Sequence, residues 1–228
     1  MIPPTSIDGT DITGATIDGT DVQEITVDGD VVFSAGPPVV FTESWEGAYP
    51  GNWQGSTGQF NQVSTNPFDG SQHLQKNTTS NDHIYIDISS TGISQSGGFQ
   101  LKIYKNGNNT PFGEEGGPAI YDSNGDGYLF RDNEGEANFR FADSFDIGSS
   151  ITTYSGSPLN LPKSGWYYTL LTVNGSNFTV EYFDSNDNSL VGPFNMSDST
   201  RSGCDQFVGF ENARSGALTD LVQVIDTS

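Results

Sequence analysis

The sequence is short of basic residues, histidine and cysteine. Its 228 residues include 8 Lys and Arg, 2 His and 1 Cys. A single cysteine excludes an internal disulfide, and Cys204 is expected to be a small buried hydrophobe. Two histidines without cysteine partners are too few for a histidine-based zinc site. The basic residues form no cluster, which excludes nucleic-acid binding through a basic patch and makes an anionic membrane surface an unattractive partner.

Long apolar runs are absent as well. No stretch reaches the ~18 apolar residues that a membrane helix needs, so we expect no transmembrane segment. The opening "MIPPTS" has no charged n-region and no apolar h-region, so we expect no classical signal peptide. Helical periodicity is never sustained, whereas 28 Gly, 11 Pro and 12% aromatic residues fit an all-β protein with many turns.

Acidic residues are abundant. The chain has 29 Asp and Glu against 8 Lys and Arg, which gives a net charge of −21 and a pI near 4.1. Such a surface repels itself in dilute buffer and is tolerated where salt screens the charges. The Asp-rich, Lys-poor composition is typical of extreme halophiles, which we favour over an ordinary acidic extracellular or virion protein.

The first 36 residues carry an internal repeat. Asp-Gly recurs at Asp8-Gly9, Asp18-Gly19 and Asp28-Gly29, and β-branched residues flank each copy. Asp-Gly favours a type I′ turn between strands. The repeat therefore predicts a four-strand meander with a bulge near Gln23. Its expected strands are 4–7, 11–17, 21–27 and 30–34.

This meander is too small to be stable alone. About 30 residues bury too little apolar surface to offset the entropy of ordering, and both edges remain unpaired. We expect the meander to be ordered against another copy of itself or a partner protein, as an anchoring or assembly element. The alternative is that it is simply the first sheet of the following domain. The proline-containing "SAGPPVV" predicts a boundary near residue 36, giving domains 1–36 and 37–228.

The rest of the chain alternates short strands with polar turns. In "HIYIDI", Ile84, Ile86 and Ile88 share one face, as in a half-buried antiparallel strand. Many short strands without helices predict two packed sheets, an antiparallel β-sandwich or jelly roll. The expected strands are 39–44, 59–63, 72–75, 83–88, 98–104, 118–122, 127–132, 137–142, 150–153, 166–173, 177–183, 189–194, 206–211 and 219–225.

Several segments resemble a laminin-G-like, concanavalin-A-like jelly-roll domain in their order and spacing. They are "FTESWEGAYPGNWQGSTGQFNQVSTNPFDGSQHLQ" (41–75), "GYLFRDNEGEANFRF" (127–141), "GWYYTLLTVNGSNFTVEYFDSNDNSLVGPFNMSDSTRSGCDQFVGF" (165–210) and "GALTDLVQV" (216–224). The Asp-Gly repeats followed by "ITVDGDVVFSA" resemble N-terminal segments of structural proteins from tailed haloarchaeal viruses. The two resemblances imply a concanavalin-A-like fold in a virion structural protein of the tail-fibre, spike or turret type.

Two sets of oxygen ligands are candidates for Ca²⁺. Asp122, Asn124 and Asp126 form a D-x-N-x-D-G run like the first half of a calcium loop. A plain hairpin turn is the alternative, because a bidentate Glu is missing at the twelfth position. The jelly-roll resemblance implies a second, structural Ca²⁺ site, at which the matching residues are Glu43, Asp69 and Asp220.

Catalytic patterns are missing. The E-x-D-x-x-E strand motif of related glucanases does not occur, and no Ser-His-Asp arrangement can be read. His73 and His83 lie in strand-like contexts and are expected on strand surfaces. We therefore expect a non-enzymatic protein.

Aromatic side chains remain as binding groups, because sugars stack on aromatic rings beside polar neighbours. The candidate ligand-binding residues are Trp53, Tyr49 and Tyr154. Trp53 lies in the polar loop "YPGNWQGSTG", where its ring is expected to be exposed, whereas Trp166 begins a strand and is expected in the core.

The expected function is display of a lectin-like jelly roll on a virion surface, for attachment to host glycans or for surface decoration. The meander would bind other virion proteins or form a homo-oligomer, with a trimer favoured over a pentamer. The alternative is a secreted or surface carbohydrate-binding module of a haloarchaeal cell.

Overall fold

The computed structural model describes residues 37–106, 116–133, 136–154, 161–162 and 164–228, together with six short strands in the first 34 residues. The chain divides into two compact units, Met1–Pro38 and Val39–Ser228. In the described part the only helical elements are two 3-10 turns, η1 (Thr57–Gln59) and η2 (Ser89–Thr91). None of the described helices has the length and apolar character to span a bilayer.

The strands described in the first unit form three separate antiparallel hairpins, β1–β2, β3–β4 and β5–β6. Each hairpin spans one Asp-Gly pair. The strands are β1 (Ser6–Ile7), β2 (Thr10–Asp11), β3 (Thr16–Ile17), β4 (Thr20–Asp21), β5 (Glu24–Val27) and β6 (Asp30–Ser34). The predicted pairing of neighbouring strands across each Asp-Gly pair is present, but the described strands form three separate sheets, and the expected strands 11–17 and 21–27 each contribute to two of them. The register irregularity lies between Ile25 and Thr26, two to three residues later than predicted.

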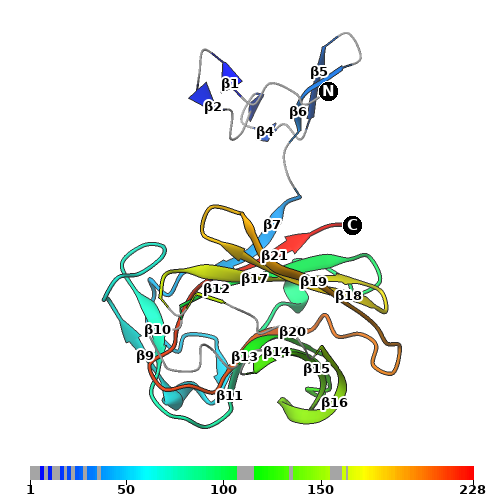
Figure 1. The fold of residues 1–228 in the computed structure, drawn as a ribbon. Coiled ribbons are helices and arrows are strands. Elements are labelled where there is room, and N and C mark those ends of the chain that lie inside the picture. Colours follow the sequence, from blue (N-terminus) through cyan, green and yellow to red (C-terminus); the bar gives the residue numbers. More distant parts are fainter. Residues whose placement is uncertain are drawn as a thin grey trace. The chain divides into compact units, whose positions relative to one another are not determined.

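The second unit is a sandwich of two antiparallel sheets (Figure 1). The first sheet has the order β19-β18-β17-β12-β21-β10-β9, and β7 also pairs with β21. Its strands are β7 (Val39–Glu43), β9 (Phe60–Val63), β10 (His73–Lys76), β12 (Phe99–Asn106), β17 (Tyr167–Asn174), β18 (Asn177–Asp184), β19 (Ser189–Ser197) and β21 (Leu218–Asp226). The last strand, β21, lies inside this sheet, and such pairing of strands far apart in sequence is typical of a jelly roll.

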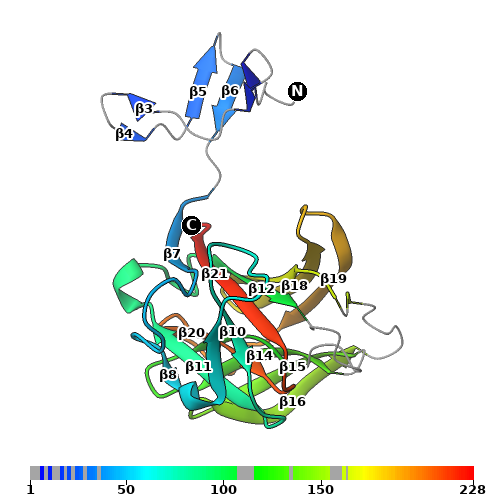
Figure 2. The same cartoon turned by 90° about the vertical axis from the view of Figure 1, so that its left-hand side faces the viewer.

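The second sheet has the order β16-β15-β14-β13-β20-β11-β8. Its strands are β8 (Gln54–Gly55), β11 (Asp82–Asp87), β13 (Gly116–Tyr121), β14 (Gly127–Asn133), β15 (Glu136–Asp143), β16 (Asp146–Tyr154) and β20 (Phe207–Asn212). The register between β15 and β16 shifts on both sides of Arg140. Such bulges bend a strand pair, and Figure 1 shows this hairpin curling beneath the second sheet. The rotated view in Figure 2 shows β15 and β16 at the same edge.

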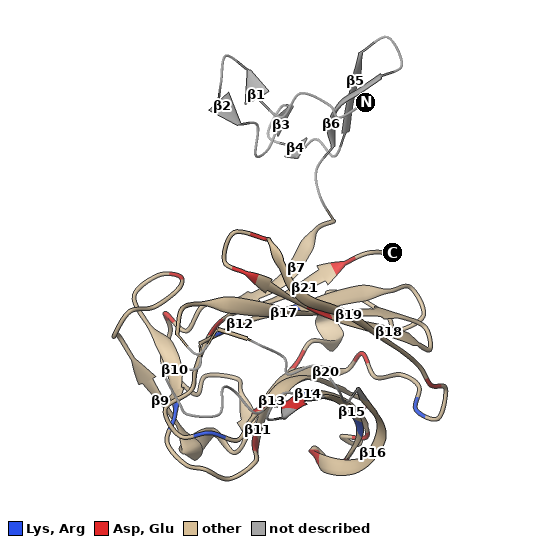
Figure 3. Ribbon diagram, in the orientation of Figure 1, with Lys and Arg blue, Asp and Glu red and all other residues tan. Residues whose placement is uncertain are grey.

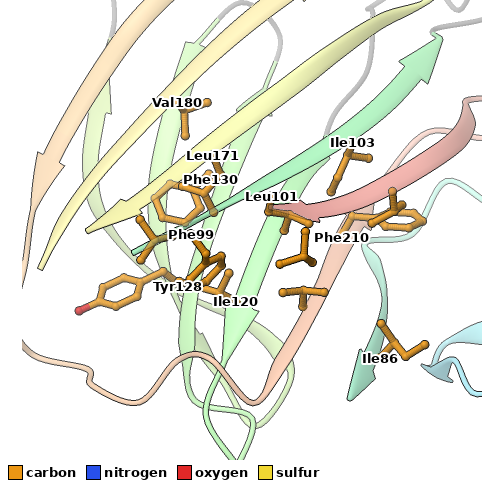
Figure 4. Close-up of a cluster of buried hydrophobic side chains, with 14 of the residues drawn as sticks. Ile86, Phe99, Leu101, Ile103, Ile120, Tyr128, Phe130, Leu171, Val180 and Phe210 are labelled. Carbon is orange, nitrogen blue, oxygen red and sulfur yellow. The ribbon is translucent and has the colours of Figure 1, made fainter. Parts of the chain in front are cut away.

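The core lies between the two sheets. Alternate residues of both sheets point inward, and Figure 4 shows part of this cluster. The predicted alternation of "HIYIDI" is confirmed, because Ile84, Ile86 and Ile88 all belong to the core. Cys204 is buried with them, as predicted.

Three residues differ from their predicted environments. Trp166 is half-buried outside the core, and its indole Nε1 donates to the carbonyl of Asn66 at 3.2 Å. His73 and His83 lie on strands, as expected, but their exposed fractions are 0% and 5%. Tertiary packing covers both imidazoles, which the local alternation of residues could not reveal.

Candidate ligand-binding site

The outer face of the second sheet carries a small apolar cluster of its own. Tyr121 is buried in this cluster, and Tyr85 and Phe145 are among the partly buried residues packed against it. Phe145 lies in the β15–β16 turn, yet its ring stacks on that of Tyr85 in β11 with 3.9 Å between centroids. Strands β14, β13 and β20 separate β15 from β11 in the sheet. The hairpin therefore folds back over the outer face and makes it concave.

The tip of this hairpin has an unusual backbone. Asp143 pairs with Asp146, so Ser144 and Phe145 are the two central residues of the turn, with φ of 54° and 63°. Positive φ at both positions is the signature of a type I′ turn, which normally uses Asn-Gly. The ring of Phe145 fits against Gly125, where a Cβ would come within 2.3 Å of it. Packing between Tyr85 and Gly125 offsets the conformational cost of the turn.

A cavity of ≈ 330 Å³ lies beside this tip, and we call it the hairpin pocket. It is bordered by β8 and the following residue, by β11 with the residue before it, and by the β15–β16 turn. The lining residues are Gly55, Ser56, Asn81, His83, Tyr85, Ser144, Phe145 and Asp146.

His83 is the most constrained polar residue of the hairpin pocket. Its Nδ1 lies 3.5 Å from the hydroxyl of the fully buried Tyr121, and its Nε2 has no hydrogen-bond partner among the residues that the structure describes. Nε2 is 3.8 Å from Oδ1 of Asp146, too far for a direct hydrogen bond. Burial lowers the pKa of His83 to about 4, although Asp146 opposes the shift, so the imidazole is neutral at pH 7. In the tautomer in which the hydroxyl of Tyr121 donates to Nδ1, the ring proton is on Nε2.

Two further polar side chains of the hairpin pocket, Asn81 and Asp146, are oriented by hydrogen bonds to their neighbours. Arg131 donates from Nη2 to Oδ1 of Asn81 at 3.2 Å, which turns the amide NH₂ of Asn81 into the available donor. Arg131 is itself held by Glu211, with 3.5 Å between Nε and Oε2. The carboxylate of Asp146 accepts from the amide of Ile147 at 2.7 Å and is largely exposed.

The hairpin pocket is thus lined by the imidazole of His83 and the amide of Asn81, which can both donate, beside one carboxylate and an aromatic wall. A ligand with adjacent hydroxyls can accept from the donors and donate to Asp146. Asp146 is the only carboxylate among the residues that line the pocket, so a pair of acids for glycoside hydrolysis is absent there. The contacts of the His83 ring go to Tyr121 and Asp146 and include no serine or threonine hydroxyl.

A second cavity of ≈ 360 Å³ lies beside β7, and we call it the tryptophan pocket. Glu43 lines it, and its Oε1 accepts from the amide of Trp45 at 2.7 Å while Oε2 accepts from Nε1 of Trp53 at 3.2 Å. The two indoles pack with 4.8 Å between centroids. Tyr49 also lines the cavity and donates its hydroxyl to the carbonyl of Thr57 at 3.0 Å.

The structure therefore places two of the three predicted ligand-binding residues, Trp53 and Tyr49, at one cavity. The predicted exposure of Trp53 is wrong. Its exposed fraction is 5%, because the indole packs against Trp45 and Phe210 and reaches Glu43. Tyr154 is the last residue of β16, and its side chain lies outside the described residues.

Of the predicted calcium ligands Glu43, Asp69 and Asp220, the structure brings the last two together, since the amide of Asp69 donates to the carboxylate of Asp220. Among the described residues, no group of three His, Cys, Asp or Glu could hold a metal ion. Oδ2 of the fully buried Asp220 accepts from the amides of Phe68 and Asp69, at 2.6 and 3.1 Å. Burial raises the pKa of Asp220 to about 6. Asp220 therefore holds a loop in place through Oδ2, and calcium binding by this set stays a prediction.

The second predicted set forms the β13–β14 turn. Oδ1 of Asp122 accepts from the amides of Asn124 and Asp126, at 2.8 and 3.0 Å, as in an Asx turn. Asp126 forms an ion pair with Arg201 at 2.8 Å. A basic side chain thus lies next to Asp126, one of the predicted calcium ligands. The contacts of this segment are those of a plain hairpin turn, which was the alternative interpretation of the sequence.

Sequence reasoning did not select Asn81, His83, Phe145 or Asp146 as site residues. One signal was present, because the alternation that places Ile84 and Ile86 in the core places His83 and Tyr85 together on the opposite face. The contribution of Phe145 and Asp146 depends on the curl of a hairpin about 60 residues later, which no local pattern encodes.

Comparison with known proteins finds similarity in structure only. No protein-family model and no curated protein matches the chain. A carbohydrate esterase from the Shiga toxin-encoding bacteriophage phi24B is 13% identical, with 85% of this chain and 100% of that chain covered and a TM-score of 0.52. Carbohydrate-binding module CBM66 from Bacillus subtilis is 15% identical, with coverages of 76% and 95% and a TM-score of 0.51.

A further match is the CBM2 module of the evolved Dit protein of Lactobacillus casei BL23 phage J-1. It is 13% identical, with 83% of this chain and 96% of that chain covered and a TM-score of 0.51. At such identities the similarity establishes the fold alone. The predicted fold class, an antiparallel jelly-roll sandwich, is confirmed.

Proposed function

We propose that the Val39–Ser228 unit is a non-enzymatic carbohydrate-binding module and that the hairpin pocket is its glycan site. The observation that carries this proposal is Nε2 of His83, a buried polar atom without a hydrogen-bond partner among the described residues, in a side chain that lines a cavity with a carboxylate and an aromatic wall. Buried polar atoms in folded proteins are nearly always hydrogen-bonded, so an unpaired one in a cavity suits a polar ligand. Sugar hydroxyls provide both acceptors and donors.

Charge narrows the class of glycan. Asp146 is the only charged group among the lining residues apart from the neutral His83, and the whole chain carries −21. An anionic polysaccharide would be repelled at long range and would place like charges together in the pocket. The ligand is therefore an uncharged glycan with adjacent free hydroxyls.

The test is binding of neutral oligosaccharides to the full chain in high salt, first on an array and then by calorimetry. Asp146→Asn and His83→Gln each remove one polar partner, and each is expected to weaken binding about tenfold or more, as for hydrogen bonds that involve a charged or buried group. Asp187→Asn is the matched control, because it removes an exposed charge at a turn of the first sheet.

The control is expected to bind like the unmodified protein. If both Asp146→Asn and His83→Gln bind the glycan with full affinity, the hairpin pocket is not the glycan site. Failure of the unmodified chain to bind any neutral glycan would contradict the proposed function itself.

We propose a viral setting for this module. The Asp-Gly repeat would anchor it to the virion of a tailed virus of a haloarchaeon, where it attaches to host-surface glycans or decorates the particle. Three features support this setting: the order of repeat and single jelly roll, the halophilic charge, and the similar fold of a phage module. Repeated copies would strengthen weak sugar binding through avidity.

The alternative setting is a surface or secreted module of the haloarchaeal cell. Mass spectrometry of gradient-purified virions and of host cell envelopes distinguishes the two. We expect the chain in the virion fraction, and its presence only in uninfected cell envelopes would favour the cellular alternative.

A further inference from the structure

The tryptophan pocket differs in chemistry from the hairpin pocket. Phe41, Tyr49 and Trp53 contribute aromatic groups to its lining, and Glu43 contributes the only ionisable carboxylate. None of the lining residues is a lysine, an arginine or a histidine. A single negative charge therefore faces an aromatic cavity.

The carboxylate of Glu43 is held in a fixed orientation. Each of its oxygens accepts one hydrogen bond, from the amide of Trp45 and from the indole of Trp53. Both partners are neutral, and the described residues offer Glu43 no ion pair. A pre-oriented carboxylate without a compensating charge favours a cationic ligand.

The rings around Glu43 decide which kind of cation fits. A hard metal ion needs several oxygen ligands, and the described residues contain no group of three side chains that could hold one. An organic ammonium group needs no oxygen cage and is attracted to the faces of aromatic rings, most readily when it is quaternary and therefore weakly hydrated. Burial raises the pKa of the Tyr49 hydroxyl, so this ring remains neutral and acts through its π system.

We infer that the tryptophan pocket binds an alkylammonium group, with Glu43 as the counter-ion and Tyr49 and Trp53 as parts of the aromatic wall. The group could be presented as a quaternary ammonium or as a primary amine on a sugar, and the experiment distinguishes these sources. This site is independent of the proposed glycan site, because no residue lines both cavities.

The experiment is a titration of the full chain at constant high ionic strength with choline and with 3,3-dimethylbutan-1-ol, its uncharged isostere. Trp45 and Trp53, two of the three tryptophans, lie at the cavity, so intrinsic fluorescence reports occupancy. Choline is expected to bind about tenfold or more tightly than the isostere, in line with cation–π attraction in a desolvated site. Glucosamine against N-acetylglucosamine is the second arm, and tighter binding of glucosamine than of choline identifies a primary amine.

Single substitutions test whether the preference for choline arises at the tryptophan pocket. Glu43→Gln is expected to abolish the preference for choline over the isostere. Glu46→Gln removes an equal charge from an exposed residue of the same segment and is expected to leave the preference unchanged. Tyr49→Leu is expected to weaken ammonium binding about fivefold to thirtyfold, whereas Tyr49→Phe keeps the ring and stays within about twofold.

Circular dichroism checks that each variant is folded. If Glu43→Gln fails to fold, the difference in ammonium binding between Tyr49→Leu and Tyr49→Phe still tests the inference. Equal binding of choline and the isostere would overturn the inference. Equal losses in Glu43→Gln and Glu46→Gln, or in both Tyr49 variants, would overturn it as well. Loss of ammonium binding with intact glycan binding, and the reverse, separate this inference from the proposed function.

Discussion

His83 and Asp220 show how burial sets the chemistry of single residues in this protein. Both are almost or completely buried, and burial shifts each pKa towards the neutral form, to about 4 for His83 and about 6 for Asp220. Asp220 uses its carboxylate to hold a loop, whereas His83 lines a cavity and its buried Nε2 has no hydrogen-bond partner among the described residues. The cost of burying an ionisable side chain thus applies to both residues. Asp220 has a structural role, whereas His83 is a candidate binding residue.

The lowered pKa of His83 predicts a loss of stability in acid. The folded state has a pKa of about 4 and the unfolded state 6.5, so only the unfolded state gains this proton between those pH values. The stabilising contribution is complete above pH 6.5 and is lost as pH falls through about 4. The glutamine in His83→Gln does not titrate. Between pH 7 and pH 4.5, the unfolding free energy of this variant should therefore fall by about 2–3 kcal/mol less than that of the unmodified chain.

Denaturant unfolding at the two pH values, in high salt, measures this difference. His73→Gln is the control for the other histidine, whose pKa is also lowered by burial. An identical pH dependence in His83→Gln and in the unmodified chain would show that His83 is not held neutral by the fold.

The candidate site was only partly predictable at the residue scale. Composition and local context identified Tyr49 and Trp53 as binding candidates, and both line the tryptophan pocket. The exposure of Trp53 was predicted wrongly because indole packing against Trp45 depends on the path of the loop. His83 was assigned to a strand surface because the hairpin that covers it is distant in sequence.

At the scale of elements, the β15–β16 hairpin determines whether the hairpin pocket exists. Its tip has positive φ at Ser144 and Phe145, which is unfavourable for both residue types. The amide of Ser144 donates to Oδ1 of Asp126, and Phe145 stacks on Tyr85. The turn is therefore maintained by contacts of its backbone and of one aromatic ring.

Two substitutions at this turn should have opposite effects. Ser144→Gly relieves the positive φ and keeps the amide contact, so we expect stabilisation by about 0.5–1 kcal/mol. Phe145→Ala keeps the unfavourable φ and loses the stacking, so we expect destabilisation by about 2 kcal/mol or more, together with weaker glycan binding. Thermal unfolding measures both, and destabilisation by Ser144→Gly would contradict the assigned turn geometry.

Strand positions were the most predictable elements. Period-two alternation located fourteen of the strands of the second unit within a few residues, because each strand has one face in the core. Strand β8 was missed, since Gln54–Gly55 is too short to show any alternation. Each Asp-Gly pair falls between the two strands of one hairpin, as predicted, whereas turn residues do not specify whether such hairpins join into one sheet.

At the scale of the whole molecule, the distribution of charge dominates. Five basic residues of the described part, Lys76, Lys102, Lys105, Arg131 and Arg201, form ion pairs with acidic residues. Figure 3 shows Asp and Glu spread over strands and loops of the second unit. With 29 acidic residues in the chain, most carboxylates have no basic partner and repel one another.

This repulsion predicts salt-dependent folding. We expect the β-sheet circular dichroism signal to be lost as salt falls below roughly molar concentration, where the net charge is less screened. Sodium chloride and potassium chloride should act alike, since screening does not depend on a specific ion site. An unchanged spectrum after dialysis into dilute buffer would contradict the prediction.

The Asp-Gly repeat predicts an assembly that the jelly roll alone does not form. In high salt, we expect multi-angle light scattering to give the mass of a trimer for the full chain and of a monomer for Val39–Ser228, which has its own core. Equal oligomeric states for the two chains would show that the repeat does not drive self-association, and docking on a different protein would then be its remaining role.

The central claim is that the hairpin pocket holds a neutral glycan through His83, and imidazole ¹⁵N NMR of the full chain tests it most directly. The chain has 2 histidines, and a His73→Gln variant assigns their signals. At pH 7 we expect His83 to be neutral with its proton on Nε2, and its signals to move on addition of a binding oligosaccharide while those of His73 stay in place. A protonated His83, or His83 signals that do not move at saturating glycan, would contradict the account.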